Sequence, residues 1–239
     1  MQKNNIVKTF TFLDESGALI PLKSQNRCYY GIGIFKHTHP IQLVQKMHPI
    51  FENLCSALKK DETRLEFSFK STTRSSIKYD LMFLDILLHD YDWEFNCLYF
   101  DANDKNFRQP LPPIGLWEAY VKYSKLLIKQ NLWSNEQTTV IADYQKKPTL
   151  SKKLFEFISI DIPQVHNVLQ AESHGLLLVQ AVDMLLGGFL YSLEVNSGDK
   201  EGNKTAISNK ILEIKKKVGS KKFNCWPIDW SKSSRLERV

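Results

Sequence analysis

Four acidic side chains in this sequence stand where apolar segments end or are interrupted. Asp14, Asp101 and Asp143 each end a strand-like run of β-branched and aromatic residues, and Asp183 interrupts the most apolar segment of the chain. A carboxylate in such a place is costly to bury unless it is paired, hydrogen-bonded or bound to a cation. Carboxylate oxygens are preferred ligands of Mg²⁺ and Mn²⁺, and two such ions about 4 Å apart support phosphodiester hydrolysis. The acids therefore predict a divalent-metal site.

Each of these acids also has a purely structural interpretation. Asp14 and Glu15 could form a hairpin turn with the Ser-Gly pair that follows them. Asp183 could accept a buried hydrogen bond from the backbone or pair with Lys or Arg. Because successive side chains of a strand alternate between its faces, Glu15 is expected to point away from Asp14 and to have a local turn or hydrogen-bonding role.

Other kinds of active site find little support in the sequence. His37 and His39 follow a strand-like run, but neither HExxH nor HxxEH accompanies them, and GxxxxGK[ST] and GxSxG do not occur. No two cysteines have the CxxC spacing of a zinc knuckle or a redox pair. The four cysteines are Cys28, Cys55, Cys97 and Cys225. Buried free thiols suit a reducing compartment, and no long apolar run follows the N-terminus, so a cytoplasmic protein is expected.

Strand-like segments are followed by helix-like segments along the chain. Strands are predicted at residues 7–13, 28–36, 93–100, 138–143 and 165–169. Helices are predicted at residues 41–59, 77–89, 115–132, 149–158 and 174–193, before a Lys-rich helix that ends near residue 218. Pro49 is expected to kink or break the first helix. Gly31 and Gly33 share one strand face, where they leave room for a packed helix.

The apolar segment at residues 174–193 is long enough to span a membrane. However, Asp183 lies near its middle, where a charge costs about 2.5–3.5 kcal/mol on insertion. The segment is therefore interpreted as a helix buried against the sheet, and no membrane contact is expected. Gln180, Asp183 and Gly187 share one face of this helix, and Gly187 is expected to let that face approach the sheet closely.

The formal net charge is +6, and most of it lies near the C-terminus. Residues 200–239 contain eleven Lys/Arg and four Asp/Glu, whereas the rest of the chain is nearly balanced. A basic end on a neutral body indicates either contact with a polyanion such as nucleic acid or a solvated helix face. Trp226 and Trp230, close to Lys221 and Lys222, could stack on bases or pack the C-terminal segment onto its own domain.

The order of four motifs resembles the domain-of-unknown-function 3800 family over about residues 7–193. The motifs are LDESG at 13–17, EFSFK at 66–70, IAD at 141–143 and, within 172–187, ES followed by QAVD and a glycine. That family looks like a branch of the ribonuclease H-like superfamily. The resemblance implies an α/β fold with a mixed central sheet of about five strands flanked by helices. It implies a domain at residues 1–195 with a helical insertion at about 40–90, and a basic helix and tail at 196–239 packing on the same domain.

The resemblance also assigns roles to individual residues. Asp14 would be the central ligand that bridges two ions. Glu66, Asp143 and Asp183 would complete the catalytic carboxylate cage. The groups expected beside the cage are Lys70 as a phosphate-facing cation and Glu172, Ser173 and Gln180 as outer ligands or their hydrogen-bond partners. In the wider superfamily the second acid usually lies on the first helix after the three-stranded meander, which would favour Glu118. Glu66 is preferred here, because its Glu-x3-Lys spacing to Lys70 matches the narrower family.

These observations predict a metal-dependent nuclease that hydrolyses DNA or RNA with two Mg²⁺ or Mn²⁺ ions. Nucleic acid is the expected partner. Two alternatives on the same fold stay open. One is a non-catalytic module that binds nucleic acid or protein through the basic C-terminal end. The other is a recombinase that transfers strands, which would need end-recognition domains for which this chain has little length.

Overall fold

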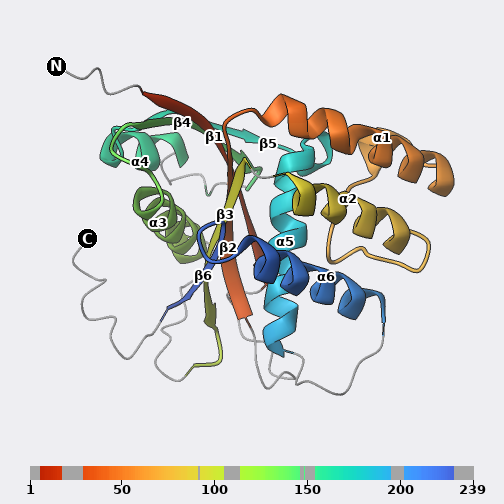
Figure 1. The fold of residues 1–239 in the computed structure, drawn as a ribbon. Coiled ribbons are helices and arrows are strands. Elements are labelled where there is room, and N and C mark those ends of the chain that lie inside the picture. Colours follow the sequence, from red (N-terminus) through yellow and green to blue (C-terminus); the bar gives the residue numbers. More distant parts are fainter. Residues whose placement is uncertain are drawn as a thin grey trace.

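A six-stranded mixed sheet forms the centre of the computed structural model of this protein (Figure 1). The structure describes residues 6–17, 29–90, 92–104, 114–145, 148, 154–194 and 202–228. Helices cover both faces of the sheet, which confirms the predicted α/β class with a mixed sheet flanked by helices. The sheet has six strands and not about five, because the C-terminal segment adds a strand at one edge.

The direction of the strands brings several strand ends to one edge of the sheet. The strands are β1 (Val7–Gly17), β2 (Tyr29–His37), β3 (Trp93–Asp101), β4 (Glu136–Asp143), β5 (Val165–Ala171) and β6 (Phe223–Pro227). Their order is β5-β4-β1-β2-β3-β6, and of these strands only β2 runs antiparallel to its neighbours. The chain moves outward from β1 in both directions, and ligands of open α/β sheets bind beyond the carboxyl ends of strands at such a point.

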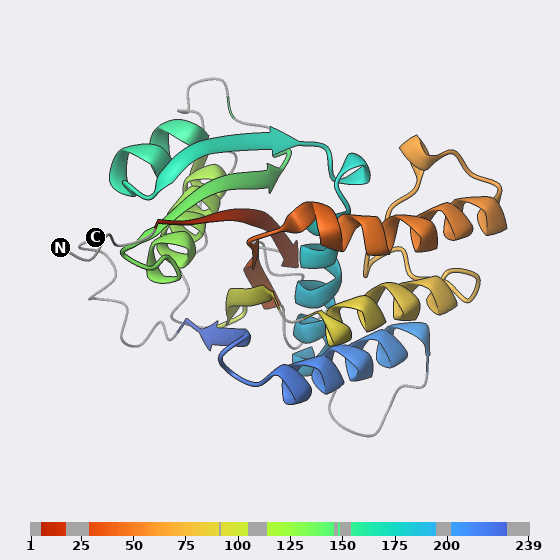
Figure 2. The same ribbon diagram turned by 45° about the horizontal axis from the view of Figure 1, so that its top comes forward.

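Two layers of helices enclose the sheet. The helices are α1 (Pro40–Leu58), α2 (Ile77–His89), α3 (Ile114–Gln130), α4 (Leu154–Asp161), α5 (Leu177–Glu194) and α6 (Asn203–Val218), with short 3₁₀ turns η1 (Glu62–Arg64) and η2 (Ser173–Gly175). Figures 1 and 2 show α1, α2, α5 and α6 on one face and α3 and α4 on the other. Because side chains alternate along β1, Phe12 packs into the core under α5 and Leu13 into the core under α3.

Some elements differ from those predicted. α1 continues through Pro49 without a break, since Met47 and Phe51 on either side are buried in the same core and packing outweighs the lost hydrogen bond. β6 pairs in parallel with β3, so the segment that carries Trp226 packs onto its own domain, with that side chain 38% exposed. Trp230 and the first residues of the helix predicted at 149–158 lie outside the described residues.

α5 is the apolar helix at the centre of one layer. In the described part of the chain it is the one helix long and apolar enough to cross a membrane, but 72% of its apolar window is buried inside the protein. Gly31 and Gly33 of β2 face it. A Cβ atom at either glycine would lie 3.0 Å from the side chain of Leu186 or of Val182. The room for a packed helix that these glycines predicted is therefore confirmed.

Gly187 does not face the sheet, which corrects the expectation for this residue. A Cβ atom at Gly187 would lie 2.8 Å from the Cβ of Phe69, in the irregular segment between η1 and α2. The backbone N–H of Phe67 donates to Gln180 Oε1 (2.9 Å), and that of Phe69 donates to Asp183 Oδ2 (3.0 Å). The polar stripe of α5 thus holds this segment, because the segment needs hydrogen-bond partners that the sheet does not supply.

Replacing Gly187 by valine should destabilise the protein, because the added methyl groups would push the Phe69 segment away from α5. We expect a loss of about 1–3 kcal/mol, with a fall in Tm of about 2–4 °C for each kcal/mol in a chain of this size. Gly175→Val is the control, since a Cβ atom at Gly175 meets nothing within 4 Å. An unchanged Tm for Gly187→Val in thermal unfolding would contradict the close approach.

Candidate functional site

The carboxyl ends of β1 and β4 face the first turns of α5 across a small cavity of about 160 Å³. It is lined by Asp14, Glu15, Glu66, Phe67, Ser68, Asp143, Ser173, Gln180 and Asp183. The four acids expected to form a cage are all among these residues, together with two of the outer groups, Ser173 and Gln180. Folding thus brings together acids from a long stretch of the sequence.

Asp14 and Asp143 come from neighbouring parallel strands. In the register of β1 and β4, Leu13 lies opposite Ala142. Asp14 and Asp143 are the next residues of the two strands; β4 ends there, whereas β1 continues to Gly17. Phe12, two residues before Asp14, lies in the core under α5, so Asp14 projects toward the same helix. The Asp14 side chain is 7% exposed, and its Oδ1 accepts a hydrogen bond from the backbone N–H of Glu15 (2.8 Å).

α5 contributes Gln180 and Asp183, about one turn apart. The buried Gln180 amide accepts from Phe67 through Oε1 and donates through Nε2 to the carbonyl of Ser173 (2.9 Å). It therefore ties η2 and the segment before α2 to α5. Asp183 accepts from the backbone N–H of Phe69 and also lines the cavity. Asp183 thus makes the buried backbone hydrogen bond that its structural interpretation predicted, and its carboxylate still faces the other acids.

Glu66 enters the site from the segment between η1 and α2. Its Oε2 accepts a hydrogen bond from Ser173 Oγ (2.9 Å), and the side chain is otherwise exposed to solvent. Glu172, next to Ser173, is exposed and does not line the cavity. Glu66 is therefore the member of the group that solvent reaches most easily.

Besides Glu172, two of the predicted residues lie outside the cavity. Lys70 is exposed just beyond Phe69 and does not line it. Glu118 is exposed on α3, the helix that covers the opposite face of the sheet. The structure therefore brings Glu66 to Asp14 and leaves the alternative, Glu118, on the other side.

Glu15 also lines the cavity, which was not expected from the sequence. Its Oε1 accepts a hydrogen bond from Gln145 Nε2 (2.5 Å), whereas its Oε2 has no hydrogen-bond partner within the described residues. The expected hydrogen-bonding role is therefore present, and the partner is Gln145. The position of Gln145, two residues after the acid that ends β4, could have indicated this partner once β4 was paired with β1.

Burial raises the pKa of the acids in this cavity. For Asp14 burial is the largest cause, and the charges of Glu15, Asp183 and Asp143 add to it. Burial and the charge of Asp143 raise the pKa of Glu15 to about 7. Burial also raises the pKa of Asp143 and of Asp183, where the charge of Glu66 adds to it and hydrogen bonds oppose it. Deprotonated together, these acids repel one another.

A buried acid at the other end of the sheet is neutralised in a different way. Glu136 at the start of β4 is 3% exposed, and its Oε2 lies 3.0 Å from Lys36 Nζ. Thr9 Oγ1 donates a further hydrogen bond to Glu136 (2.7 Å). Within the described ranges, no Lys, Arg or His forms an ion pair with an acid of the cavity. A bound cation would supply there the charge that Lys36 supplies to Glu136.

The donor set of the cavity fits a hard cation. Its charged groups offer carboxylate oxygens, which Mg²⁺ and Mn²⁺ prefer. Elsewhere in the described residues, His48, Glu52 and Glu62 bring ligand atoms within 4.8 Å of one another, but all three are exposed. No three acids of the cavity come that close together, so a cation bound there would be held partly through its waters, of which Mg²⁺ keeps several.

No protein-family model and no curated protein matches this chain. The resemblance to the domain-of-unknown-function 3800 family therefore stays a prediction. The candidate site depends on its own geometry and charge: buried acids from separate segments, raised pKa values, and no ion-pair partner in the described part of the chain.

Without metal, the free energy of unfolding should fall as pH rises from about 4 to about 7. The raised pKa values mean that the folded state binds more protons than the unfolded state in this window, and Glu15, with a pKa of about 7, contributes up to its upper end. Mn²⁺ should raise the Tm, and more so at pH 7.5 than at pH 5, because the ligands must lose their protons. Thermal unfolding with and without Mn²⁺ measures both effects.

Asp14→Asn should raise the metal-free Tm at pH 7.5, because it removes one of the repelling charges and keeps the shape of the side chain. A gain of about 2–4 °C is expected for each kcal/mol of relief, and the rise caused by Mn²⁺ should be lost. Glu118→Gln, which removes an exposed acid outside the cavity, should behave as the wild type. If Mn²⁺ stabilises Asp14→Asn as much as the wild type, Asp14 is not a ligand.

Proposed function

We propose that this protein is a divalent-metal-dependent nuclease that hydrolyses phosphodiester bonds in DNA or RNA. The main support for this proposal is a cavity lined by four acids that form no ion pair among the described residues. These acids are Asp14, Glu66, Asp143 and Asp183. Uncompensated buried charges destabilise a fold. Two bound cations would turn the same group into a favourable arrangement, and two-metal sites act on phosphodiesters.

The four acids would share the ions according to their positions. Asp14 interacts with the charges of both Asp143 and Asp183, so it would hold a cation together with either of them. Glu66 adds an exposed carboxylate on the solvent side. Bound Mg²⁺ or Mn²⁺ would supply an activated water and stabilise the charge that develops on the phosphate oxygens.

The protein's own groups set the shape of the site. Gln180 fixes η2 and the Phe67 backbone against α5. Ser173 Oγ orients Glu66 through its hydrogen bond. Because Asp14 is buried and Glu66 is exposed, the phosphodiester approaches from the side of Glu66.

The architecture and the sequence motifs support the same proposal. Asp143 ends β4 and Asp14 lies on the neighbouring strand β1, at the point where the chain leaves β1 in both directions, a common place for ligands in open α/β sheets. The resemblance in sequence carries the expectation of ribonuclease H-like metal chemistry. A module that only binds nucleic acid through its basic helix would need none of these buried acids, so we favour the enzyme.

Cleavage of labelled single- and double-stranded DNA and RNA in Mg²⁺ or Mn²⁺ tests the proposal. Asp14→Asn and Asp183→Asn should each lower the rate by more than about 100-fold, because loss of even an outer partner of a metal ligand typically costs 10–100-fold. Ser173→Ala, which loses one hydrogen bond to Glu66, should lower it by about 10-fold.

Glu118→Gln is the matched control and should cleave at the wild-type rate. Chelation of the metal should abolish cleavage in every variant. Binding of nucleic acid without any turnover in either metal would indicate the non-catalytic module instead. Equal rates for the wild type and Asp14→Asn would remove the cavity from the mechanism.

A further inference from the structure

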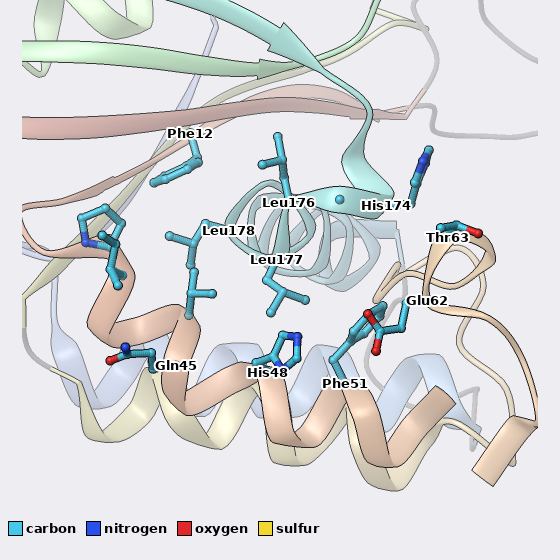
Figure 3. A pocket seen from close by; sticks show the side chains of 14 residues that line it. Phe12, Gln45, His48, Phe51, Glu62, Thr63, His174, Leu176, Leu177 and Leu178 are labelled. Atoms are coloured by element: carbon cyan, nitrogen blue, oxygen red, sulfur yellow. The ribbon is translucent and has the colours of Figure 1, made fainter. Parts of the chain in front are cut away.

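A second, larger cavity of about 450 Å³ lies beside the acids, between α1, β1 and the start of α5 (Figure 3). Phe12 of β1 and Leu177 and Leu178 of α5 form apolar walls, and Phe51 of α1 closes one side. The volume falls in the range of ligand pockets, which is about 300–1,000 Å³. The cavity therefore offers flat apolar surfaces to a small ring system.

The polar groups of this cavity are side chains that donate or accept hydrogen bonds. Figure 3 shows Gln45 and His48 on α1, Thr63 on η1 and His174 on η2 around the apolar walls. Among the described residues that line it there is no Lys or Arg, and the one acid is Glu62. Such a lining disfavours a phosphate group and suits a neutral heterocycle whose edge carries donors and acceptors.

The two cavities share their walls. η2 separates them, since Ser173 lines the acidic cavity while His174 and Gly175 line the apolar one. On α5, Leu177 and Leu178 face the apolar cavity and are followed by Gln180 and Asp183 of the acidic one. With a rise of about 1.5 Å per residue, the two sites lie within about one nucleotide of each other along the helix.

Cationic groups lie on the other side of the acids. Further along α5, Gly187 packs against Phe69, and Lys204 of α6 places its Nζ 5.4 Å from the centre of the Phe69 ring. Lys70 is exposed next to Phe69. From the start of α5 toward its end, the apolar cavity therefore comes first, the acids second and the cationic side chains third. A polynucleotide strand carries its bases and its phosphates on opposite sides, and this order of charge is complementary to it.

We propose that the apolar cavity receives one unstacked nucleobase of a single-stranded nucleic acid, next to the phosphodiester held at the acids. This inference rests on the proposed nuclease function and narrows its substrate. A base that is paired and stacked in a duplex cannot enter the apolar cavity without being extruded. Single strands, loops and frayed ends are therefore the preferred substrates, and the base adjoining the cut is recognised by contact with apolar walls.

An abasic scan of a labelled single-stranded oligonucleotide tests the inference. Each substrate lacks one base, and the cleavage ladder in Mn²⁺ is compared with that of the intact strand. Cleavage by the wild type should fall by about fivefold or more at one fixed offset from the missing base, the change typical for loss of one base stack. A duplex of the same sequence should be cleaved more slowly than the single strand.

Gly175→Trp provides the matched variant, because a Cβ atom at Gly175 meets nothing within 4 Å and the added ring can occupy the cavity. It should cleave intact strands several-fold more slowly. It should also lose the dip in the ladder, that is, the fall in cleavage at a fixed offset from the missing base. Ile160→Trp is the control for an added tryptophan, since Ile160 is 71% exposed on α4 across the sheet. It should retain both the rate and the dip.

The outcomes separate this inference from the function on which it rests. A metal-dependent ladder with no dip at any offset, or a Gly175→Trp variant that keeps the dip, overturns the base site and leaves the nuclease intact. Absence of metal-dependent cleavage overturns both. Dimerisation of the wild type that Gly175→Trp abolishes would assign the cavity to a second copy of the chain and overturn the base site as well.

Discussion

Like charges that are taken out of water repel one another strongly, and this fold holds several carboxylates at the end of its central strands. Asp14 and Asp183 are largely enclosed, and the pKa of each is raised by burial first and by neighbouring acids second. The described residues supply no opposing charge to this group. The arrangement is stable only if protons or bound cations reduce the repulsion. This requirement is the reason to regard the cavity as a metal site.

α5 shows how one helix meets structural and chemical demands together. Its apolar faces fill the core. Its polar side chains accept backbone hydrogen bonds from the segment between η1 and α2, bonds that a neighbouring strand would otherwise accept. Asp183 both accepts a backbone hydrogen bond and faces the other acids, so the structural and the chemical interpretation of this residue are compatible. Gly187 lets Phe69 lie close to the helix, and the same segment carries Glu66 to the cavity.

The surroundings of the acids are ordered by polarity. Apolar walls lie toward the start of α5, the acids follow, and Lys204 lies beyond them near Phe69. An extended polyanion with flat apolar side groups matches this order better than a compact anion does. The buried Lys36–Glu136 pair, at the opposite end of the sheet, is self-neutralised and has no such neighbours.

Much of the local structure could be predicted because its signals are local. Alternation with a period of two and helical periodicity identify strands and helices from neighbouring residues. Acids at strand ends, with a polar stripe on an apolar helix, singled out Asp14, Asp143 and Asp183. The same criterion also selected Asp101, which ends β3 and does not line the cavity. The sixth strand escaped prediction because β6 is short and is stabilised mainly by pairing with β3, which is distant in sequence.

The sequence by itself therefore determined the α/β class, most of the helices and strands, and which acids were candidate metal ligands. The sequence motif favoured Glu66 over Glu118. Only the tertiary structure decided that β4 lies beside β1, and that Glu66 and Glu15 line the same cavity as Asp14. It also decided that Gly187 contacts Phe69 and not the sheet. These outcomes depend on the register and packing of segments far apart in the chain. Such contacts are chosen by the burial and hydrogen bonding of the whole fold, and no local pattern encodes them.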